Sequence, residues 1–175
     1  PARICFYGDH QDYLGLPVIA GTIDRFINLR ATPNSNKQYL LKLLDLNEEA
    51  SISLDDDLKA IQPDDYFRSV MAVLKREGFQ LDQGYDIEIS GNIPVNAGLS
   101  SSSALVVAWI RFLVATQGKS DDISGYQIGR WAYEAEVLFF DQPGGLMDQY
   151  TIAQKGLIYI DTKNGESTRL NASLG

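Results

Sequence analysis

The stretch NIPVNAGLSSSSA, from Asn92 to Ala104, carries most of the information about the fold. It follows a segment whose apolar residues alternate as in a half-buried strand, and it leads into a long apolar segment typical of a helix. Proline and glycine turn the chain between the two, and the helix opens on four consecutive serines. The unpaired backbone N–H groups and the dipole of such a helix point at one spot, which suits an anion.

The serines are open to two interpretations. A single serine would cap the helix, and the others would then have no role. Four serines after a proline and a Gly-Leu pair exceed what capping requires, so we expect phosphate binding, with a hydroxyl available to Mg²⁺. The stretch is not a Walker P-loop, because it lacks the GxxxxGK[ST] pattern. The candidate phosphate-binding residues are Pro94, Gly98, Leu99, Ser100, Ser101, Ser102 and Ser103.

A second segment, PARICFYGDHQDYLG from Pro1 to Gly15, reads as a strand followed by a cluster of polar residues. Asp9, His10, Asp12 and Tyr13 offer several hydrogen-bonding groups within a few positions, which suits a polyhydroxylated ligand. A metal site is weakly indicated, because the cluster has one histidine and no second ligand at a fixed spacing. From the residues alone, an ordinary polar loop remains the default interpretation.

A third segment, AYEAEVLFFDQPGGLMDQY from Ala132 to Tyr150, carries two carboxylates of interest. Near a phosphate loop, one could hold Mg²⁺ and the other could accept or orient a substrate hydroxyl. Taken alone, Glu136 is more simply an exposed charge at the edge of an apolar helix stripe. Asp148 could equally be an acid that the dipole of a short helix favours.

The three segments together resemble the GHMP kinases, and within them the galactokinases. The segment Pro1–Gly15 resembles the signature PGRxNLxGEHxDYxGG, the stretch Asn92–Ala104 the GLSSS motif, and the segment Ala132–Tyr150 an AE…GIMDQ segment of the same length. They arrive in the family's order and span most of the chain, from Pro1 to about Asp161. Ala2, Asp9 and Leu16 depart from the family's glycine, glutamate and glycine. Asp9 is one methylene shorter than glutamate, so the far end of a sugar would be held differently.

This resemblance implies an enzyme that uses ATP and Mg²⁺ to phosphorylate a sugar hydroxyl, by analogy the anomeric one. Asp148 would accept the proton of that hydroxyl or orient it, and Arg3 would stabilise the transferred group. Ser102 and Glu136 would hold the Mg²⁺ ion. The region from Asn34 to Asp82 carries no motif, although the family's adenine pocket draws on it. The residues implied in sugar binding are Asp9, His10, Asp12, Tyr13 and Gly145.

Three other classes fit less well. A mevalonate-type kinase shares the fold and the serine loop, but usually lacks the HxDY pattern and carries lysine where Arg3 stands. A galactokinase-like sugar sensor binds without turnover, and is expected to have a damaged serine loop or no catalytic aspartate. An RNA-binding domain needs a basic face, whereas this chain has a net charge of −8.

Composition favours one ordinary globular domain. The chain has 175 residues, 45% of them hydrophobic and 22% charged, and its single cysteine, Cys5, cannot form an internal disulfide. It shows no apolar run long enough to span a membrane and no signal peptide, so we expect a cytoplasmic protein that binds neither membrane nor nucleic acid.

Strands and helices mix without strict βαβ alternation, which predicts an α+β fold. The resemblance implies the GHMP amino-terminal domain, similar to the ribosomal protein S5 domain 2-like fold. A helix should begin at Asp64 or Asp65, and another after Ser124 should bury a stripe of Ile128, Trp131, Ala135 and Leu138. Loop is expected between residues 46 and 63, a helix over Leu99–Thr116, and a short helix around Asp148. The predicted strands are the start of the chain, Pro17–Leu29, Gln38–Leu46, Tyr85–Ile93 and Gly156–Asp161.

The resemblance also implies that residues 1–175 form an amino-terminal domain whose carboxy-terminal partner domain is absent from this chain. We therefore expect the chain alone to have little or no activity. Apolar surface at the docking site of the missing half would favour self-association.

Overall fold

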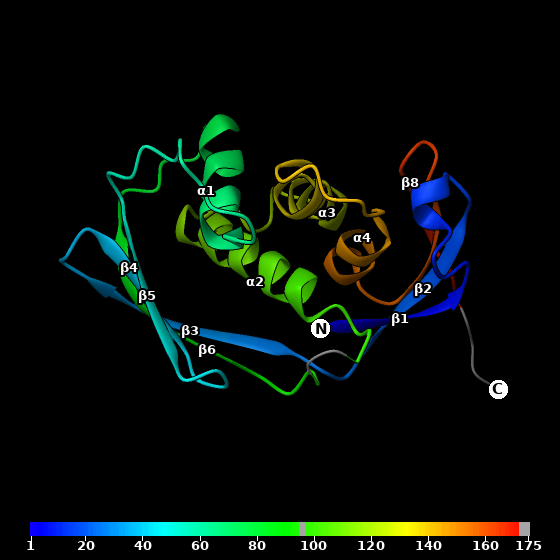
Figure 1. Ribbon diagram of the computed structural model, residues 1–175, viewed down its shortest axis with the longest axis horizontal. Helices are drawn as coiled ribbons and strands as arrows, with labels where there is room; N and C mark the ends of the chain where they lie inside the picture. The colour runs from blue at the N-terminus through cyan, green and yellow to red at the C-terminus, as the bar shows by residue number, and fades with distance from the viewer. Residues whose placement is uncertain (95–96, 172–175) are drawn as a thin grey trace.

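The computed structural model describes residues 1–94 and 97–171, and it contains two four-stranded sheets with helices between them. Figure 1 shows one sheet at the left, the other at the right, and α1 to α4 between and above them. The predicted α+β class is confirmed. Among the described residues, no helix combines the length and the apolar character needed to cross a membrane.

The right-hand sheet in Figure 1 has the strand order β1-β2-β7-β8, and all its pairs are antiparallel. The left-hand sheet has the order β3-β6-β4-β5 and is mixed, because β4 runs parallel to β6 with Tyr39 opposite Tyr85. The strands are β1 (Ala2–Tyr7), β2 (Val18–Ile23), β3 (Ile27–Asn34), β4 (Gln38–Leu43), β5 (Glu48–Ser53), β6 (Gly84–Gly91), β7 (Leu157–Asp161) and β8 (Glu166–Arg169).

Four α-helices and two short helices of other types complete the secondary structure of the described residues. Asp65 caps α1 by accepting the Arg68 N–H at 3.1 Å, as the sequence predicted. Helix α3 follows Ser124, as predicted, and Ser124 caps it by accepting the Gln127 N–H at 3.2 Å. The helices are the 3₁₀ helix η1 (Asp12–Leu14), α1 (Tyr66–Arg76), α2 (Ser101–Thr116), α3 (Gly125–Tyr133), the π-helix η2 (Glu134–Leu138) and α4 (Met147–Gln154).

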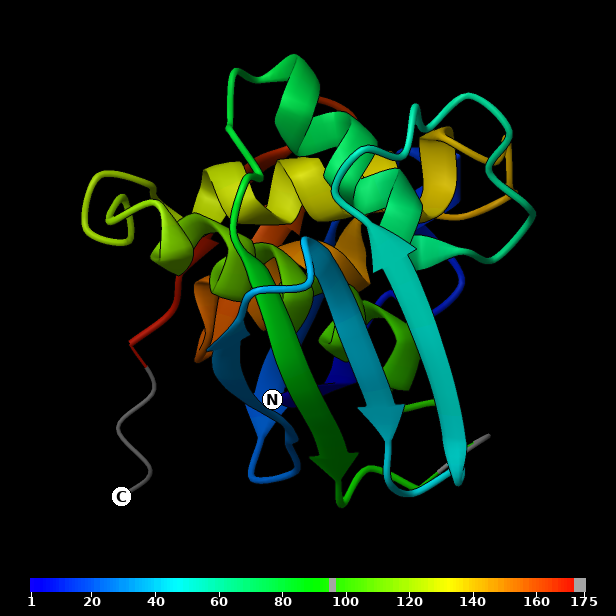
Figure 2. The same ribbon diagram turned by 90° about the vertical axis from the view of Figure 1, so that its left-hand side faces the viewer.

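The larger of two cores lies between the inner face of the β3-β6-β4-β5 sheet and the helices α1, α2 and α3. Trp109 of α2 is at its centre, with its ring edge-on to Tyr39 and Phe67 and its indole N–H bonded to the Phe67 carbonyl at 3.1 Å. In Figure 2 this sheet stands in front of the helices, with its outer face toward the viewer. The core therefore fixes α2, whose first turn carries the serines, against that sheet.

The smaller core joins α4 to the β1-β2-β7-β8 sheet. Met147 and Tyr150 of α4 pack against apolar side chains of β2 and β7. Because Asp148 lies between these two buried anchors, the packing of α4 on the sheet fixes where its carboxylate points.

Two of the predicted strand and loop assignments are wrong. The predicted strand Pro17–Leu29 is two strands, β2 and β3, which belong to different sheets. The chain leaves the first sheet at Asp24 and Arg25, where polar residues interrupt the β-forming run. The predicted loop after residue 46 contains the edge strand β5, whose sequence EEASIS has low β-propensity and buries only Ile52.

Two smaller corrections concern helices. Helix α2 begins at Ser101 rather than Leu99, because Ser100 adopts a left-handed backbone with φ of 58°. Leu138, predicted on the buried stripe, is 58% exposed. The π-helix η2 adds a residue to its turn, with the Phe139 N–H bonded to the Glu134 carbonyl at 2.8 Å, and so rotates Leu138 away from the core.

Candidate active site

An open cleft of about 390 Å³ brings the three sequence segments together. Its walls come from the start of β1, the loop after β1, the first turn of α2, η2 and the loop before α4. The predicted site residues that line it are Arg3, Asp9, His10, Asp12, Tyr13, Ser102, Ser103, Glu136, Gly145 and Asp148.

Asp148, from the third sequence segment, receives a hydrogen bond from one side chain of each of the other two segments. The Arg3 Nε donates to its Oδ1 at 2.6 Å, and the Ser100 hydroxyl donates to its Oδ2. Arg3 also donates from Nη1 to the Gly98 carbonyl at 2.7 Å, which ties β1 to the serine loop. The Arg3 and Asp148 side chains are 12% and 28% exposed, so the pair is accessible from the cleft but largely enclosed.

Ser100 stands at the N-cap position of α2 but makes no side-chain capping bond. Its hydroxyl is used on Asp148 instead, and its backbone has a φ of 58°, which is uncommon for a residue other than glycine. The capping interpretation is therefore wrong for this serine. The first N–H groups of α2 have no partner within the helix, as at any helix start, and the same turn carries Ser102 and Ser103, which line the cleft.

Asp12 lies against the turn that precedes α4. Its Oδ2 accepts the Met147 N–H at 3.3 Å and its Oδ1 accepts the Tyr13 N–H at 3.0 Å. A Cβ at Gly145 would lie 1.8 Å from the Asp12 Oδ2, so only glycine leaves room for this carboxylate. Gly145 thus contacts Asp12, and its lack of a side chain keeps that carboxylate in the cleft.

Asp9 and His10 form the outer rim of the cleft. Their side chains approach at 3.7 Å, His10 Nε2 to Asp9 Oδ2, and are 63% and 85% exposed. Tyr13, on η1, is also exposed. These polar groups are therefore open to solvent, and a ligand that enters the cleft can contact them directly.

Glu136 is buried at the base of the cleft, 6% exposed, whereas the sequence alone favoured an exposed charge. It lies within the π-helix η2, which directs it inward. Burial raises the pKa of Glu136, while hydrogen bonds from Gln149, Ser102 and Ser103 lower it again; the nearby Asp148 adds to the rise. The Gln149 Nε2 donates to its Oε2 at 2.7 Å.

These residues fit a magnesium site completed by a ligand. Within residues 1–94 and 97–171, no group of three or more histidine, cysteine, aspartate or glutamate side chains is arranged to hold a metal. Mg²⁺ is commonly bound through one or two carboxylates together with substrate phosphates and water. Glu136 supplies a carboxylate, and Ser102 beside it supplies a hydroxyl.

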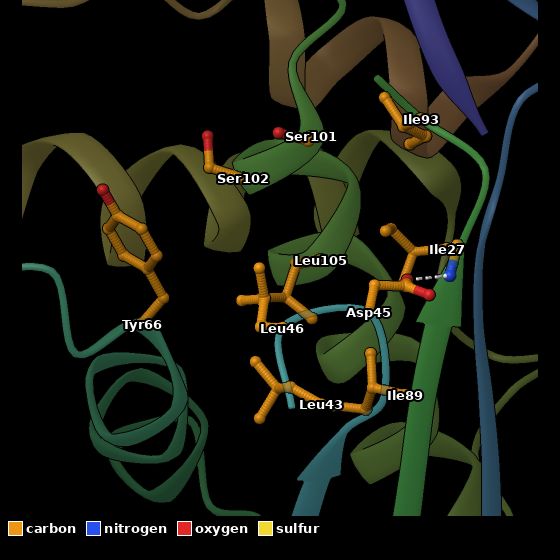
Figure 3. A pocket seen from close by; sticks show the side chains of 11 residues that line it. Ile27, Leu43, Asp45, Leu46, Tyr66, Ile89, Ile93, Ser101, Ser102 and Leu105 are labelled. Carbon is orange, nitrogen blue, oxygen red and sulfur yellow. Dashed lines mark hydrogen bonds between the residues drawn. The ribbon is translucent and has the colours of Figure 1, made fainter. Parts of the chain in front are cut away.

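A second pocket, of about 300 Å³, adjoins the cleft and is mainly apolar (Figure 3). The side chains of Ser102 and Tyr66 line both cavities. At the other side, the Asp45 Oδ2 accepts the Gly91 N–H at 2.6 Å and holds the β4–β5 turn against β6. The remaining lining residues are Ile27, Leu43, Leu46, Ile89, Ile93, Ser101 and Leu105.

A family model described as the GHMP kinases N terminal domain matches residues 65–156, more than half of the chain. The chain belongs to the GHMP kinases. The matched range includes the serine loop, Glu136 and Asp148, while the Arg3 and Asp12 segment lies before it.

Relatives of known activity are similar over nearly the whole of this GHMP kinase chain. The galactokinase of Streptococcus mutans is 33% identical over 185 residues, covering 100% of this chain and 46% of the relative. The galactokinase of Thermococcus kodakarensis is 30% identical over 166 residues, covering 93% and 46%. The resemblance to galactokinases is confirmed, and the chain spans about half the length of the curated relatives it matches.

Solved structures of GHMP kinases share the fold. Lactococcus lactis galactokinase, solved with galactose, superposes with a TM-score of 0.88 at 22% identity, over 100% of this chain and 46% of that one. Methanococcus jannaschii mevalonate kinase superposes with a TM-score of 0.83 at 23% identity, over 98% and 54%. At these identities the likeness establishes the fold and leaves the substrate open.

Some predicted residues of the GHMP kinase loop lie outside the cleft. Pro94 is exposed after β6 and is not among the residues that line either cavity. Gly98 and Leu99 act through their carbonyls, which accept from the Arg3 side chain at 2.7 Å and from the Arg3 N–H at 3.4 Å. Val95 and Asn96, in the predicted turn, lie outside the described residues.

The sequence did not point to three polar residues of the cleft. Tyr66 and Gln142 both donate to the Asp64 Oδ1, at 3.0 and 2.9 Å, and so tie the start of α1 to the loop before α4. Burial and the Asp64 carboxylate raise the pKa of Tyr66 to about 12, so its phenol stays a hydrogen-bond donor at neutral pH. Neither lies in a recognisable motif. Gln149 does, since it follows Asp148 in the GGLMDQ segment.

Proposed function

We propose that this chain is the nucleotide- and sugar-binding part of an ATP-dependent sugar kinase, which transfers the γ-phosphoryl group of ATP to a sugar hydroxyl, in galactokinase-like fashion the anomeric one. The observation that carries the proposal is the Arg3–Asp148 pair in a cleft at the first turn of α2, with Glu136 buried beside it. Phosphoryl transfer depends mainly on positioning and on charge stabilisation, and these groups supply both.

The two adjoining cavities suit the two ends of ATP. The apolar pocket has the size and lining for a nucleobase (Figure 3), and Ser101 and Ser102 lie at its edge, where α2 begins. Phosphates that extend from that pocket would reach the free N–H groups of the first turn. The same Ser102 lines the polar cleft, so the γ-phosphate would point toward Asp148.

Mg²⁺ would be held by Ser102, Glu136 and the phosphates, and when bound it would supply neutralising charge to the phosphate oxygens. Arg3 would stabilise charge on the transferred group. Although Arg3 and Ser100 each occupy one oxygen of Asp148, each carboxylate oxygen keeps a further lone pair. Asp148 can therefore still accept a hydrogen bond from a sugar hydroxyl, and so orient it or take its proton.

The sugar would lie at the mouth of the cleft, where Asp9, His10, Asp12 and Tyr13 present polar groups to solvent. Hydroxyl recognition by such groups is selective, because an analogue that lacks a hydroxyl leaves them unpaired. Among these candidates, Asp12 has its carboxylate held in place by two backbone N–H groups, those of Tyr13 and Met147.

We also propose that residues 1–175 act together with a carboxy-terminal GHMP domain. The two galactokinases described above support such an arrangement, because this chain covers 46% of the length of each. In that case the full catalytic site belongs to the whole protein, and that protein is the one to assay.

The test is MgATP-dependent ADP release by the whole protein that carries this chain, with galactose, related sugars and mevalonate as acceptors. Asp148→Asn should lower kcat by roughly 10²-fold or more, the usual contribution of a positioned acid–base group. The matched control is Asp122→Asn, in the exposed loop between α2 and α3, which should not change kcat.

Each alternative gives a different result in this assay. Turnover with mevalonate and with no sugar would move the protein to the mevalonate-type branch. Sugar binding measured by calorimetry without ADP release would reject the kinase reaction in favour of a sugar sensor.

A further inference from the structure

Gln149 is a buried polar residue of the cleft to which the proposed reaction assigns no role. It follows Asp148 on α4, is 3% exposed, and lines the cleft. An amide side chain has two donor hydrogens and an acceptor oxygen, and its burial is costly unless these groups have partners.

Only one end of this amide is satisfied. The Nε2 donates to the Glu136 Oε2 at 2.7 Å and lies 3.4 Å from the Ser103 hydroxyl. The Oε1 has no hydrogen-bond partner among the described residues. Buried acceptors without a partner are rare in proteins, and one at the wall of a ligand cleft indicates a group that arrives with the ligand.

The contact with Glu136 also restricts that carboxylate. A carboxylate that receives an N–H on one oxygen is held in a fixed orientation, and its oxygens keep further lone pairs for a cation. Residues that orient a metal ligand in this way typically change metal affinity when they are replaced.

We infer that Gln149 is a positioning residue for the metal: its Nε2 orients Glu136, and its free Oε1 accepts a hydrogen bond from a water molecule in the hydration shell of the bound Mg²⁺. Mg²⁺ loses its water reluctantly and usually keeps several water molecules when it binds with phosphates. A water molecule that can donate to the Gln149 Oε1 therefore arrives with the ion. This inference rests on the proposed role of Glu136 and Ser102 as the metal site.

The experiment measures binding of Mn²⁺, as a paramagnetic substitute for Mg²⁺, to the whole protein in the presence of ADP. Free Mn²⁺ is quantified by electron paramagnetic resonance. Gln149→Met keeps the length of the side chain but removes the amide. We expect it to weaken Mn²⁺ binding by about 10- to 100-fold, while ADP binding without metal changes by less than about twofold.

Gln154→Met is the matched control. Gln154 lies on the same helix, is half-buried, and also has an amide atom without a partner, its Nε2, but it does not line the cleft. It should lose stability in thermal denaturation to a similar degree and keep its Mn²⁺ affinity. Equal Mn²⁺ affinity of Gln149→Met and the unsubstituted protein would overturn the inference.

A second measurement needs no variant. In protein labelled with ¹⁵N, Mg²⁺ added with ADP should shift the side-chain amide resonances of Gln149 more than those of Gln154. When Mn²⁺ is titrated instead, the Gln149 resonances should broaden at lower concentrations than the Gln154 resonances. Unchanged Gln149 resonances at saturating metal would reject its role even if Gln149→Met does not fold. If the unsubstituted protein binds ADP but no metal, the proposed site at Glu136 itself is wrong, which is a distinguishable result.

Discussion

At the scale of single residues, the cleft depends on backbone positions that admit few alternatives. Ser100 occupies a left-handed conformation that costs of order 1–3 kcal/mol, and it places its hydroxyl on Asp148 rather than on the helix. Gly145 leaves the space that the Asp12 carboxylate fills. Both positions thus determine where a carboxylate of the cleft lies.

Gly145→Ala should therefore displace Asp12, because the new Cβ would lie 1.8 Å from its Oδ2. If Asp12 binds the sugar, the loss of a hydrogen bond to a charged group corresponds to about 1.5–3 kcal/mol, or roughly 10- to 100-fold in sugar affinity. Isothermal titration with the preferred sugar would measure it.

Gly144→Ala is the control, in the same turn. Its Cβ would meet only the Val137 methyl groups, at 3.3 and 3.4 Å, which can shift slightly. Its sugar affinity should stay within about threefold of the original. A similar loss of sugar affinity in both variants would show that a change in the whole turn, rather than the loss of the Asp12 contact, causes the effect.

At the scale of elements, the π-helix η2 decides which side chains of the third segment face inward. An α-helix continued through residues 134–138 would follow the predicted stripe and bury Leu138. The wider turn instead leaves Leu138 exposed and buries Glu136 at the cleft. π-Bulges are often found at functional sites, and this one carries a candidate metal ligand.

Substitutions at the two ends of the predicted stripe should accordingly differ in their effect on the free energy of unfolding. Ile128→Ala, at a side chain that is 2% exposed, should lower the free energy of unfolding by about 2–5 kcal/mol. Leu138→Ala, at a side chain that is 58% exposed, should change it by less than about 0.5 kcal/mol. Urea denaturation followed by circular dichroism would compare them, and equal losses would contradict the rotation at η2.

At the scale of the whole molecule, the site lies where parts anchored in two cores meet. Helix α2 is fixed by the larger core, whereas α4 packs into both, with Met147 and Tyr150 in the smaller core and Ile152 and Ala153 in the larger. Arg3 of β1 bonds to both the serine loop and Asp148. A ligand that spans the apolar pocket and the cleft would contact elements from both.

MgATP should consequently stabilise the protein against unfolding. At a concentration of 100 times its Kd, a ligand that binds only the folded state adds about 2.7 kcal/mol. For a domain of this size that is a rise in Tm of roughly 5–10 °C. Differential scanning fluorimetry with MgATP would measure the shift, and Glu136→Gln should reduce the part that depends on Mg²⁺. No shift at millimolar MgATP would contradict nucleotide binding.

The sequence by itself determined most of the local elements and pointed to many of the residues that line the cleft. Helix α1 with its cap, helix α3 and strands β1, β4, β6 and β7 follow from short-range periodicity and capping, which depend on nearby residues. Asp12, Glu136 and Asp148 were candidates because of their residue types and positions, whereas Arg3 and the roles of all four came from the match to the family's motifs.

Only the tertiary structure decided features that depend on long-range contacts. The change of sheet between β2 and β3, and the edge strand β5, follow from pairing with distant strands rather than from local propensity. The burial of Glu136 follows from the π-turn, and the contacts of Ser100 and Gln149 from the approach of α4 to α2. Periodicity specifies which residues share a face, whereas the partner of each polar group depends on which elements pack together.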